Sequence, residues 1–494
     1  MIILLFFVVA ALTLAGVLIS RNQRQMNTVC IAQSVAFAFL ALFILFTGQV
    51  PSPVLRIGSP YFFIDHLGLF EVLISTVIFT FAALYARGYV EGLLASGELE
   101  KGGLRLFYIA WAALLTAIVF AFFSDNLALF WIFAELTTVI SALLVAILAA
   151  RENIDAAIKY IFIASTSMLF SFIGFIFLFE TARTVTGTGT LNWTELITAA
   201  HAFPPVMATA AFVLVFIGFA AKSGIFPFHT WLPEAHAKAP SAVSAVLSGV
   251  LLNVGIYGII RTYAIVHQTG SGQTASFILA VFGVLTIGIA AFSMIPERNL
   301  KKLIAFSSVE NMGILLVGLA VATPVALFFV LFHIMAHSLT KASLFFSAGI
   351  LHRQYKSPLS SEAVDDIRDV FTFQPIAAWG VIIGGLAITG MPPFPVFISK
   401  FFLMLQVGTV SPLVLAVVLV LLFIATVAIG FFVIITFSKR SDPVRDTKLV
   451  PYKTPASMQV PVMVLLVILL ITGIIFTHGE VSFITSIITE LKFA

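Results

Sequence analysis

Gly224-Ile-Phe-Pro227-Phe228 and Gly390-Met-Pro-Pro393-Phe394 share the pattern G-x-x-P-F and lie 166 residues apart. Each copy falls within a long apolar segment, 205–228 in the first case and 375–402 in the second. Proline has no backbone N–H to donate, so it breaks the hydrogen-bond ladder of a helix. The pattern therefore predicts two long apolar helices that are broken at these prolines.

The composition of the whole chain places these helices in a membrane. Of 494 residues, 61% are hydrophobic and only 10% are charged, whereas a soluble domain carries roughly 25% charged residues. The chain therefore has too few charges to cover a water-facing surface. This excludes a soluble enzyme, a nucleic-acid-binding protein and a disordered scaffold, and it predicts an integral membrane protein.

The number of membrane-spanning helices follows from the length of the apolar segments. About 20 mainly apolar residues cross a bilayer as a helix, and the sequence has no series of short segments of alternating polarity that would indicate a β-barrel. An all-α, polytopic fold is therefore expected. Fourteen spans are predicted, at roughly 1–20, 28–47, 65–86, 106–123, 126–150, 157–180, 205–228, 241–265, 276–295, 302–321, 324–350, 375–402, 412–437 and 459–477.

The two broken spans are the seventh and the twelfth, and other features repeat at a similar offset. Spans four and nine begin about 170 residues apart, and Glu135 in span five precedes Glu310 in span ten by 175 residues. Because five spans separate the copies, the second copy enters the membrane from the opposite side, which gives an inverted repeat typical of transporters. The expected units are 1–105 with three helices, 106–265 with helices 4–8, 276–437 with helices 9–13, and 438–494 with a loop, helix 14 and a short tail.

The basic residues predict the orientation of the chain. Loops after odd-numbered spans hold 19 of the 26 lysines and arginines, the opposite loops hold four, and three lie inside spans. Positively charged loops stay in the cytoplasm, so both termini are expected on the non-cytoplasmic side of the cell membrane (inner or plasma membrane). The 19 residues are Arg21, Arg24, Arg87, Lys101, Arg105, Arg151, Lys159, Lys238, Arg298, Lys301, Lys302, Arg353, Lys356, Arg368, Lys439, Arg440, Arg445, Lys448 and Lys453.

Several ionisable side chains fall inside the predicted spans. Each costs at least roughly 2.5–3.5 kcal/mol in the bilayer core on insertion scales, so its presence indicates a function or a specific partner. The residues of one set lie close to one of the two breaks or at matching positions of the two repeats. A second set, spaced by four residues, shares one helix face. The first set is Glu135, Lys222, Glu310 and Lys400, and the second is His333, His337 and Lys341.

Buried glutamate, lysine and histidine side chains can pass protons. Burial destabilises the charged form of a group and an opposite charge restores it, so a buried Glu–Lys pair holds a proton weakly enough to pass it on. Histidine titrates near neutral pH and both donates and accepts. The alternative is that the same groups form static ion pairs that fix helix packing, above all at Glu310. The predicted stations of a water-assisted proton path are Glu135, Lys222, His333, His337, Lys341 and Lys400.

The connection after the first break contains further histidines. His229, Glu234 and His236 lack the tight three-ligand spacing of a zinc site, so a vestibule that admits protons is favoured over a metal site, and a plain structural loop is favoured for His236. Lys301 and Lys302 are expected to anchor the cytoplasmic end of their span, with Lys302 as a candidate that borders the proton inlet.

The remaining polar residues of the spans have less specific roles. Asp65, His66 and Glu71 open the third span and are assigned to helix packing or to the lipid interface. Asp125 is assigned as the N-cap of the fifth span. The single cysteine, Cys30, excludes a disulfide framework and an iron–sulfur cluster, which usually needs four thiolates. No metal or redox cofactor is therefore expected in this chain.

With these residues in place, the chain resembles the antiporter-like subunits shared by respiratory complex I, membrane-bound [NiFe] hydrogenases and multi-subunit cation/proton antiporters. The resemblance rests on Trp231-Leu232-Pro233-Glu234-Ala235-His236 with Ala239-Pro240, on the buried Glu, Lys and His residues named above, and it runs through spans 4–13. The segment Ser308-Val309-Glu310-Asn311-Met312-Gly313 looks like the matching segment of hydrogenase-4 and formate hydrogenlyase subunits. This favours a component F-like subunit of a hydrogenase-4 type complex.

The resemblance implies a function and roles for individual residues. Members relay protons along a mid-membrane axis of charged residues and water. Glu135 and Lys222 would form a coupled pair at one end of this axis, and Lys400 would be the outlet station. Asn253 stands where complex I pumping subunits often carry a lysine, and an amide cannot hold a proton. The central relay would then need water or the face of His333, His337 and Lys341.

The resemblance also implies partners. These are other antiporter-like and membrane subunits, the lipid bilayer, and a soluble redox arm that carries iron–sulfur and [NiFe] centres, with protons or Na⁺ as the ion that moves. No nucleic acid is expected as a partner. Three alternatives stay open: a pumping subunit of complex I (NADH–quinone oxidoreductase), a subunit of a multi-subunit Na⁺/H⁺ antiporter, and a membrane scaffold whose charges do not titrate.

Overall fold

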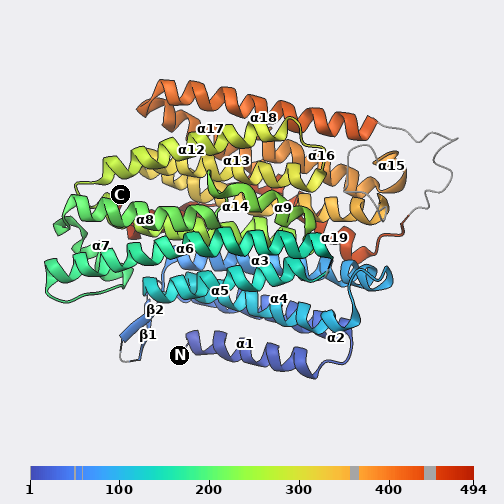
Figure 1. Ribbon diagram of the computed structural model, residues 1–494, viewed down its shortest axis with the longest axis horizontal. Helices are drawn as coiled ribbons and strands as arrows, with labels where there is room; N and C mark the ends of the chain where they lie inside the picture. Colours follow the sequence, from blue (N-terminus) through green and yellow to red (C-terminus); the bar gives the residue numbers. More distant parts are fainter. Residues whose placement is uncertain are drawn as a thin grey trace.

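The protein is a layer of long helices that run side by side (Figure 1). A computed structural model describes residues 2–48, 50, 52–57, 59–148, 150–355, 367–438 and 452–493. Five of the basic residues that predict the orientation lie outside the described residues: Lys356, Lys439, Arg440, Arg445 and Lys448.

The N-terminal half contains the first broken helix and ends with a helix that includes a π-helical segment. A two-stranded antiparallel hairpin, which the sequence interpretation missed, joins the second and third helices. The elements are α1 (Ile2–Ile19), α2 (Gln23–Phe46), β1 (Ser52–Ile57), β2 (Ser59–Ile64), α3 (His66–Ala95), α4 (Lys101–Phe122), α5 (Leu127–Ala146), α6 (Arg151–Thr186), α7 (Trp193–Ala199), η1 (Ala200–Ala202), α8 (Pro205–Lys222), η2 (Phe228–Thr230), α9 (Trp231–Lys238), α10 (Ser241–Val246), the π-helix η3 (Leu247–Leu251) and α11 (Leu252–His267).

The C-terminal half is helical throughout its described residues. It contains the second broken helix, formed by α16 and α17. The elements are α12 (Gly272–Met294), α13 (Leu300–Val321), α14 (Pro324–Tyr355), α15 (Val370–Phe373), α16 (Pro375–Thr389), α17 (Pro395–Val410), α18 (Pro412–Ser438), α19 (Ala456–Thr472) and α20 (His478–Glu490).

Among the described residues, twelve helices are long and apolar enough to cross a bilayer. Three shorter apolar helices, α16, α17 and α19, occupy the segments that the sequence assigns to spans twelve and fourteen. The protein is therefore a polytopic, helical membrane protein. The count of fourteen spans and the inverted repeat stay predictions.

Both broken helices end shortly before the prolines of the G-x-x-P-F pattern. α8 ends at Lys222 and is followed by Gly224, whose φ is +67°. α16 ends at Thr389 and is followed by Gly390, whose φ is +85°. Glycine adopts this left-handed conformation without a steric cost, and the proline that follows cannot extend the helix. The same local chemistry thus terminates both helices.

The two chain ends lie at the same end of the helical layer (Figure 1). The hairpin β1–β2 and the short helix α7 are found at this end as well, and α1 and α18 form opposite edges of the layer. Large apolar side chains on α18 are widely exposed, including Leu413 and Phe423 at 75% and 70%. Such a surface suits contact with lipid or with another membrane subunit.

The residues at the start of α3 form a structural cluster. Asp65 caps α3 by accepting a hydrogen bond from the Gly68 amide at 2.9 Å. The same carboxylate lies 2.6 Å from Arg261 Nη2 of α11, and both side chains are about 1% exposed. His66 contacts Glu490 of α20. The packing interpretation therefore holds for Asp65 and His66, because both join α3 to other helices.

The expected N-cap of α5 is displaced by one residue. The side chain of Asn126 accepts hydrogen bonds from the amides of Ala128 and Leu129, so it is the N-cap. Asp125 instead accepts hydrogen bonds from Thr194, beside α7. Burial raises the pKa of Asp125 to about 6, and the Thr194 hydrogen bonds oppose this shift. The assignment of Asp125 as N-cap was wrong because aspartate and asparagine are comparable caps and a tertiary contact decides between them.

Helices α12 and α13 approach closely at two glycines. A Cβ atom on Gly313 would lie 2.8 Å from the Gly283 carbonyl oxygen, and one on Gly283 would lie 2.9 Å from the Gly313 carbonyl oxygen. Small residues allow this close backbone contact, which drives helix association within a membrane. By contrast, a Cβ atom on Gly430 of α18 would have no neighbouring atom within 4 Å.

We therefore expect Gly313→Ala to lower the apparent unfolding temperature of the protein in detergent. The steric cost of about 1–3 kcal/mol outweighs the gain in helix propensity of roughly 0.5–1 kcal/mol. Gly430→Ala, which meets no such contact, is the matched control and should leave the temperature unchanged or raise it. Equal shifts in the two variants would contradict the close packing of α12 and α13.

Candidate functional site

Lys222 is the last residue of α8 and its side chain is fully buried. Its ammonium donates a hydrogen bond to Thr138 Oγ1 of α5 at 2.8 Å. Glu135 lies one turn earlier on α5 and accepts a hydrogen bond from the Ser165 hydroxyl of α6. The charge of Glu135 acts on Lys222, although no ion pair within 4.0 Å joins them among the described residues. Each member of the predicted pair thus has a hydroxyl group as its hydrogen-bond partner: Thr138 for Lys222 and Ser165 for Glu135.

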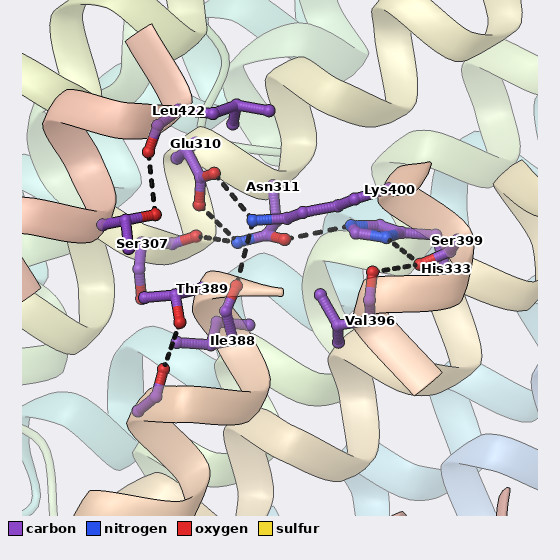
Figure 2. Close-up of polar contacts among 12 residues, drawn as sticks. Ser307, Glu310, Asn311, His333, Ile388, Thr389, Val396, Ser399, Lys400 and Leu422 are labelled. Carbon is purple, nitrogen blue, oxygen red and sulfur yellow. Dashed lines mark hydrogen bonds and ion pairs between the residues drawn. The ribbon is translucent and has the colours of Figure 1, made fainter. Parts of the chain in front are cut away.

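Lys400 lies on α17, after the second break, and forms a buried ion pair. Its Nζ is 2.9 Å from Glu310 Oε1 of α13 and 3.0 Å from the carbonyl oxygen of Ile388 (Figure 2). In an unbroken helix this carbonyl would accept from the amide of residue 392, but Pro392 has no N–H. The lysine therefore satisfies a carbonyl that the break leaves free, which explains why the break and the charge occur together.

Asn311 connects this ion pair to a histidine (Figure 2). Its Nδ2 donates to Glu310 Oε2 at 2.7 Å and to the Ser307 carbonyl at 2.6 Å. These two acceptors fix the orientation of the amide, so Oδ1 faces His333 Nε2 at 3.0 Å. Because Oδ1 only accepts, Nε2 of His333 must carry a proton. The chain of contacts from Lys400 to His333 is therefore continuous.

The other ring nitrogen of His333 can change its protonation without movement. Nδ1 lies 2.7 Å from Ser399 Oγ, and the same hydroxyl lies 3.0 Å from the Val396 carbonyl. With neutral imidazole, Ser399 donates its proton to Nδ1. With imidazolium, Nδ1 donates to Ser399, which then donates to Val396. One heavy-atom arrangement thus accommodates both states of the histidine.

Lys341 joins the same network from the opposite side. Its Nζ donates to the Ile304 carbonyl at 2.7 Å and to Ser307 Oγ at 2.5 Å, and the Ser307 carbonyl binds Asn311. His337 lies between His333 and Lys341 on α14, as the spacing of four predicted, and all three are fully buried. Neither ring nitrogen of His337 has a hydrogen-bond partner among the described residues. This places a buried, unpaired imidazole between two hydrogen-bonded groups.

The remaining predicted residues are not brought into direct contact with these groups. His229 lies in η2 and is mostly buried. Lys302 is partly exposed at the start of α13, whereas its neighbour Lys301 is 2% exposed and donates to the Ala239 carbonyl at 3.5 Å. His236 is fully buried and stacks on Phe345. The helical phase of α13 distinguishes the two lysines, because the buried positions of this helix include 304, 305 and 308.

Two residues of the site were not predicted as functional. Asn311 was quoted only as part of a motif, and it is the bridge between Glu310 and His333. Glu71 was assigned to packing or the lipid interface, but its side chain is fully buried, so the lipid interface is excluded. Its Oε2 accepts a hydrogen bond from Asn253 Nδ2 at 3.1 Å. A charged residue six positions into a span was the available signal.

No cluster of three or more His, Cys, Asp or Glu side chains suited to a metal ion occurs within the described part of the chain. Cys30 is buried and unpaired. The polar groups of the site are instead lysines, carboxylates, imidazoles, amides and hydroxyls. Groups of these types can exchange protons through hydrogen bonds.

Comparison with known proteins identifies the family. The family described as "NADH:quinone oxidoreductase/Mrp antiporter, TM" matches residues 124–441. The chain belongs to this family. The matched range contains all the predicted proton-transfer residues of this antiporter-like chain, and it leaves α1–α3, including Glu71, outside.

Relatives of this antiporter-like chain occur in several membrane complexes. The hydrogenase-4 component F homolog of Methylacidiphilum infernorum (isolate V4) is 31% identical over 420 residues, which cover 84% of each chain. A chain of the membrane-bound sulfane sulfur reductase, an archaeal respiratory membrane complex, superposes with a TM-score of 0.85 at 20% identity, covering 99% of this chain and 96% of that one. A chain of the Mrp complex from Dietzia sp. DQ12-45-1b superposes with a TM-score of 0.81 at 20% identity, covering 98% and 95%. The two structures show a shared fold.

We expect Glu310→Gln to destabilise the protein more than the double variant Glu310→Gln/Lys400→Met. Removal of one member of a buried ion pair leaves a buried charge and costs about 3–5 kcal/mol, whereas removal of both is close to neutral. Resistance to SDS unfolding measures this difference.

Glu180→Gln is the matched control, because Glu180 pairs with Arg183 at a largely exposed site. Solvent screens this exposed pair, so its loss should change the stability little. Additive losses in the double variant at Glu310 and Lys400 would show that the two residues do not stabilise each other.

Proposed function

We propose that this chain is a proton-translocating, antiporter-like subunit of a membrane-bound redox complex of the hydrogenase-4 type. The observation that carries the proposal is the buried polar cluster in which Asn311 joins Glu310 and Lys400 to His333, and in which Lys341 and Asn311 both bind Ser307, at its hydroxyl and its carbonyl respectively. Burial of protonatable groups inside a membrane protein costs stability, so their presence in contact with one another indicates a function. The similarity to a hydrogenase-4 component F homolog supports the choice of complex.

Each end of the proposed path has a different electrostatic character. At one end, the ammonium of Lys222 has a neutral hydroxyl as partner and the carboxylate of Glu135 nearby. At the other end, Lys400 is paired directly with Glu310. A proton that leaves Lys222 would pass through water toward His337 and His333, and from there through water to the pair of Glu310 and Lys400. Asn311 would hold His333 and Glu310 in position without carrying the proton. Glu135 is proposed to control the proton on Lys222, and Lys400 to be the outlet station.

Hydroxyl and amide groups would participate in this path without holding charge. Ser399 accepts or donates according to the state of His333, so it supports proton transfer at that ring. Asn253 cannot hold a proton, but its amide contacts Ser338, which follows His337 on α14. We propose His229 and Lys302 as candidates that border the inlet, together with the buried Lys301.

The proposal includes an orientation and an internal symmetry. Units 106–265 and 276–437 would be inverted repeats, flanked by 1–105 and 438–494. Support comes from the two helices that break in the same way at Gly224 and Gly390. The basic loops would face the cytoplasm, and both termini the non-cytoplasmic side of the inner or plasma membrane. The position of both termini at one end of the layer agrees with this orientation.

The energy for translocation would come from partner subunits. We propose a soluble arm with iron–sulfur and [NiFe] centres, and neighbouring antiporter-like membrane subunits that contact apolar surfaces such as that of α18. This chain would act as the non-redox subunit that moves protons in response to that arm.

Two other complexes remain candidates. A complex I pumping subunit would use the same path with a different redox arm. A subunit of a multi-subunit Na⁺/H⁺ antiporter would use the same path without a redox arm. The similarity in fold to a chain of the Mrp complex is the reason to consider this alternative. Mass spectrometry of the native complex, purified through a tag on this chain, distinguishes them when metals are measured in the same sample. Nickel with iron supports the hydrogenase type, iron without nickel supports complex I, and membrane subunits without metal support the antiporter.

We expect Glu135→Gln and Lys222→Met to abolish proton translocation in the intact complex without loss of assembly. Gln cannot hold the negative charge that acts on Lys222, and Met cannot carry a proton. Translocation in sealed membrane vesicles is followed with a pH-sensitive dye during turnover. Loss of a proton-transfer group typically lowers the rate of the affected step by about 10²–10⁴-fold.

Exposed residues with the same substitutions are the controls. Glu180→Gln and Lys101→Met alter charges near the membrane surface and should leave translocation unchanged. Full translocation in both Glu135→Gln and Lys222→Met, with the complex assembled, would rule out the proposed path and favour a membrane scaffold.

A further inference from the structure

Glu71 of α3 is a buried carboxylate for which the proposed path has no role. Its side chain is fully buried. Its contact is Asn253, near the middle of the 27-residue membrane-length segment Ser241–His267. Glu71 therefore lies deep in the bundle, at the level of the predicted proton path. No lysine, arginine or histidine forms an ion pair with it among the described residues.

The helix that faces Glu71 is distorted at this point. Asn253 Nδ2 lies within hydrogen-bond distance of Glu71 Oε2 (3.1 Å), Ser338 Oγ (3.2 Å) and the Gly249 carbonyl (3.4 Å). Gly249 belongs to the π-helix η3, which ends at Leu251, two residues before Asn253. π-Helical turns within α-helices are frequent at functional sites. The amide of Asn253 thus ties the carboxylate of α3 to the distorted segment and to α14.

The contact between Glu71 and Asn253 lies between the two groups of proton-transfer residues. Ser223, which follows Lys222, donates a hydrogen bond to the Leu252 carbonyl at 3.2 Å. Leu252 directly precedes Asn253. On the other side, Asn253 contacts Ser338, which directly follows His337. The neighbours of Asn253 therefore belong to the Lys222 end and to the histidine face.

Two buried oxygen atoms at this site have no hydrogen-bond partner among the described residues: Glu71 Oε1 and Asn253 Oδ1. An ionised carboxylate that has one amide donor and no cation is an expensive group to bury. A proton on Glu71 removes the charge and converts the oxygen that carries it into a donor. The carboxylic acid is therefore less costly here than the carboxylate, and Glu71 Oε1 has no other partner among the described residues that would compete for the proton.

We propose that Glu71 is a protonatable station of the axis and supplies, at this position, the exchangeable proton that Asn253 cannot hold. This inference rests on the proposed function. The step is a proton transfer: Glu71 Oε1 takes up a proton released by an ammonium or imidazolium group on one side. The resulting carboxylic acid then gives the proton, through water, to a group on the other side. Only O–H and N–H bonds form and break.

The test compares Glu71→Gln with Glu71→Asp in the intact complex in sealed vesicles. The Gln carbonyl still accepts a hydrogen bond from Asn253, so the contact is kept while the proton is lost. We expect the number of protons moved per turnover to fall about tenfold or more in Glu71→Gln, and Glu71→Asp to retain measurable translocation. Glu490→Gln is the matched control, because Glu490 contacts His66 of the same helix α3 outside the axis, and its translocation should equal that of the wild type.

A spectroscopic measurement keeps the test valid if coupling is lost for structural reasons. Infrared difference spectra of the purified complex should contain a carboxylic acid band that shifts in D₂O and that disappears in Glu71→Gln. Identical spectra in the wild type and in Glu71→Gln would overturn the inference. Full translocation in Glu71→Gln, or equal losses in Glu71→Gln and Glu71→Asp, would overturn it as well.

The failure of this inference can be told apart from failure of the proposed function. If Lys222→Met abolishes translocation and Glu71→Gln does not, the path exists and Glu71 is a packing residue. If Lys222→Met translocates fully, the proposed function itself is wrong.

Discussion

Every ionisable side chain inside this bundle must find its partners within the protein, because the bilayer provides none. The buried lysines meet this constraint to different degrees. Lys400 has a carboxylate and a carbonyl, Lys341 has a carbonyl and a hydroxyl, and Lys222 has a hydroxyl. The number of partners falls from two at Lys400 and Lys341 to one at Lys222. The hydrogen bonding of the buried ammonium group is therefore least complete at Lys222.

The broken helices supply part of this compensation. A helix end presents carbonyl groups that no amide satisfies, and in a membrane these groups require other donors. At the second break, the Ile388 carbonyl lacks its donor because of Pro392, and Lys400 takes that place. At the first break, the Ala221 carbonyl accepts from the Gly224 amide at 3.2 Å and from the indole of Trp231 at 2.8 Å. A proline in a span thus creates an acceptor, and the acceptor makes it less costly to bury a cation.

The sequence was sufficient to predict the helices and the buried charges, but it did not predict most of their partners. Apolar length defines a span, and G-x-x-P-F defines a break, so both are local properties. The choice of Lys301 over Lys302 for burial, and of Asn126 over Asp125 for capping, depends on contacts with distant segments. Glu71 was missed for the same reason, because a glutamate near a helix start has no local feature that places it opposite Asn253. Local sequence properties thus predicted where the apolar helices lie, whereas contacts between distant segments determined which residues are buried and which cap a helix.

The same two helices provide both a structural anchor and the proposed station. Asp65 pairs with Arg261 at one end of α3 and α11, and Glu71 contacts Asn253 further inside. Glu71 lies six positions after Asp65, about 9 Å along the helix axis, and Asn253 lies eight positions before Arg261, about 12 Å. The two helices therefore run antiparallel past each other. A shift of register at the anchor would move Glu71 away from Asn253. The buried ion pair of Asp65 and Arg261 would therefore serve the proposed path through its position alone, because it holds the Glu71 carboxyl group opposite the one amide side chain that it contacts among the described residues.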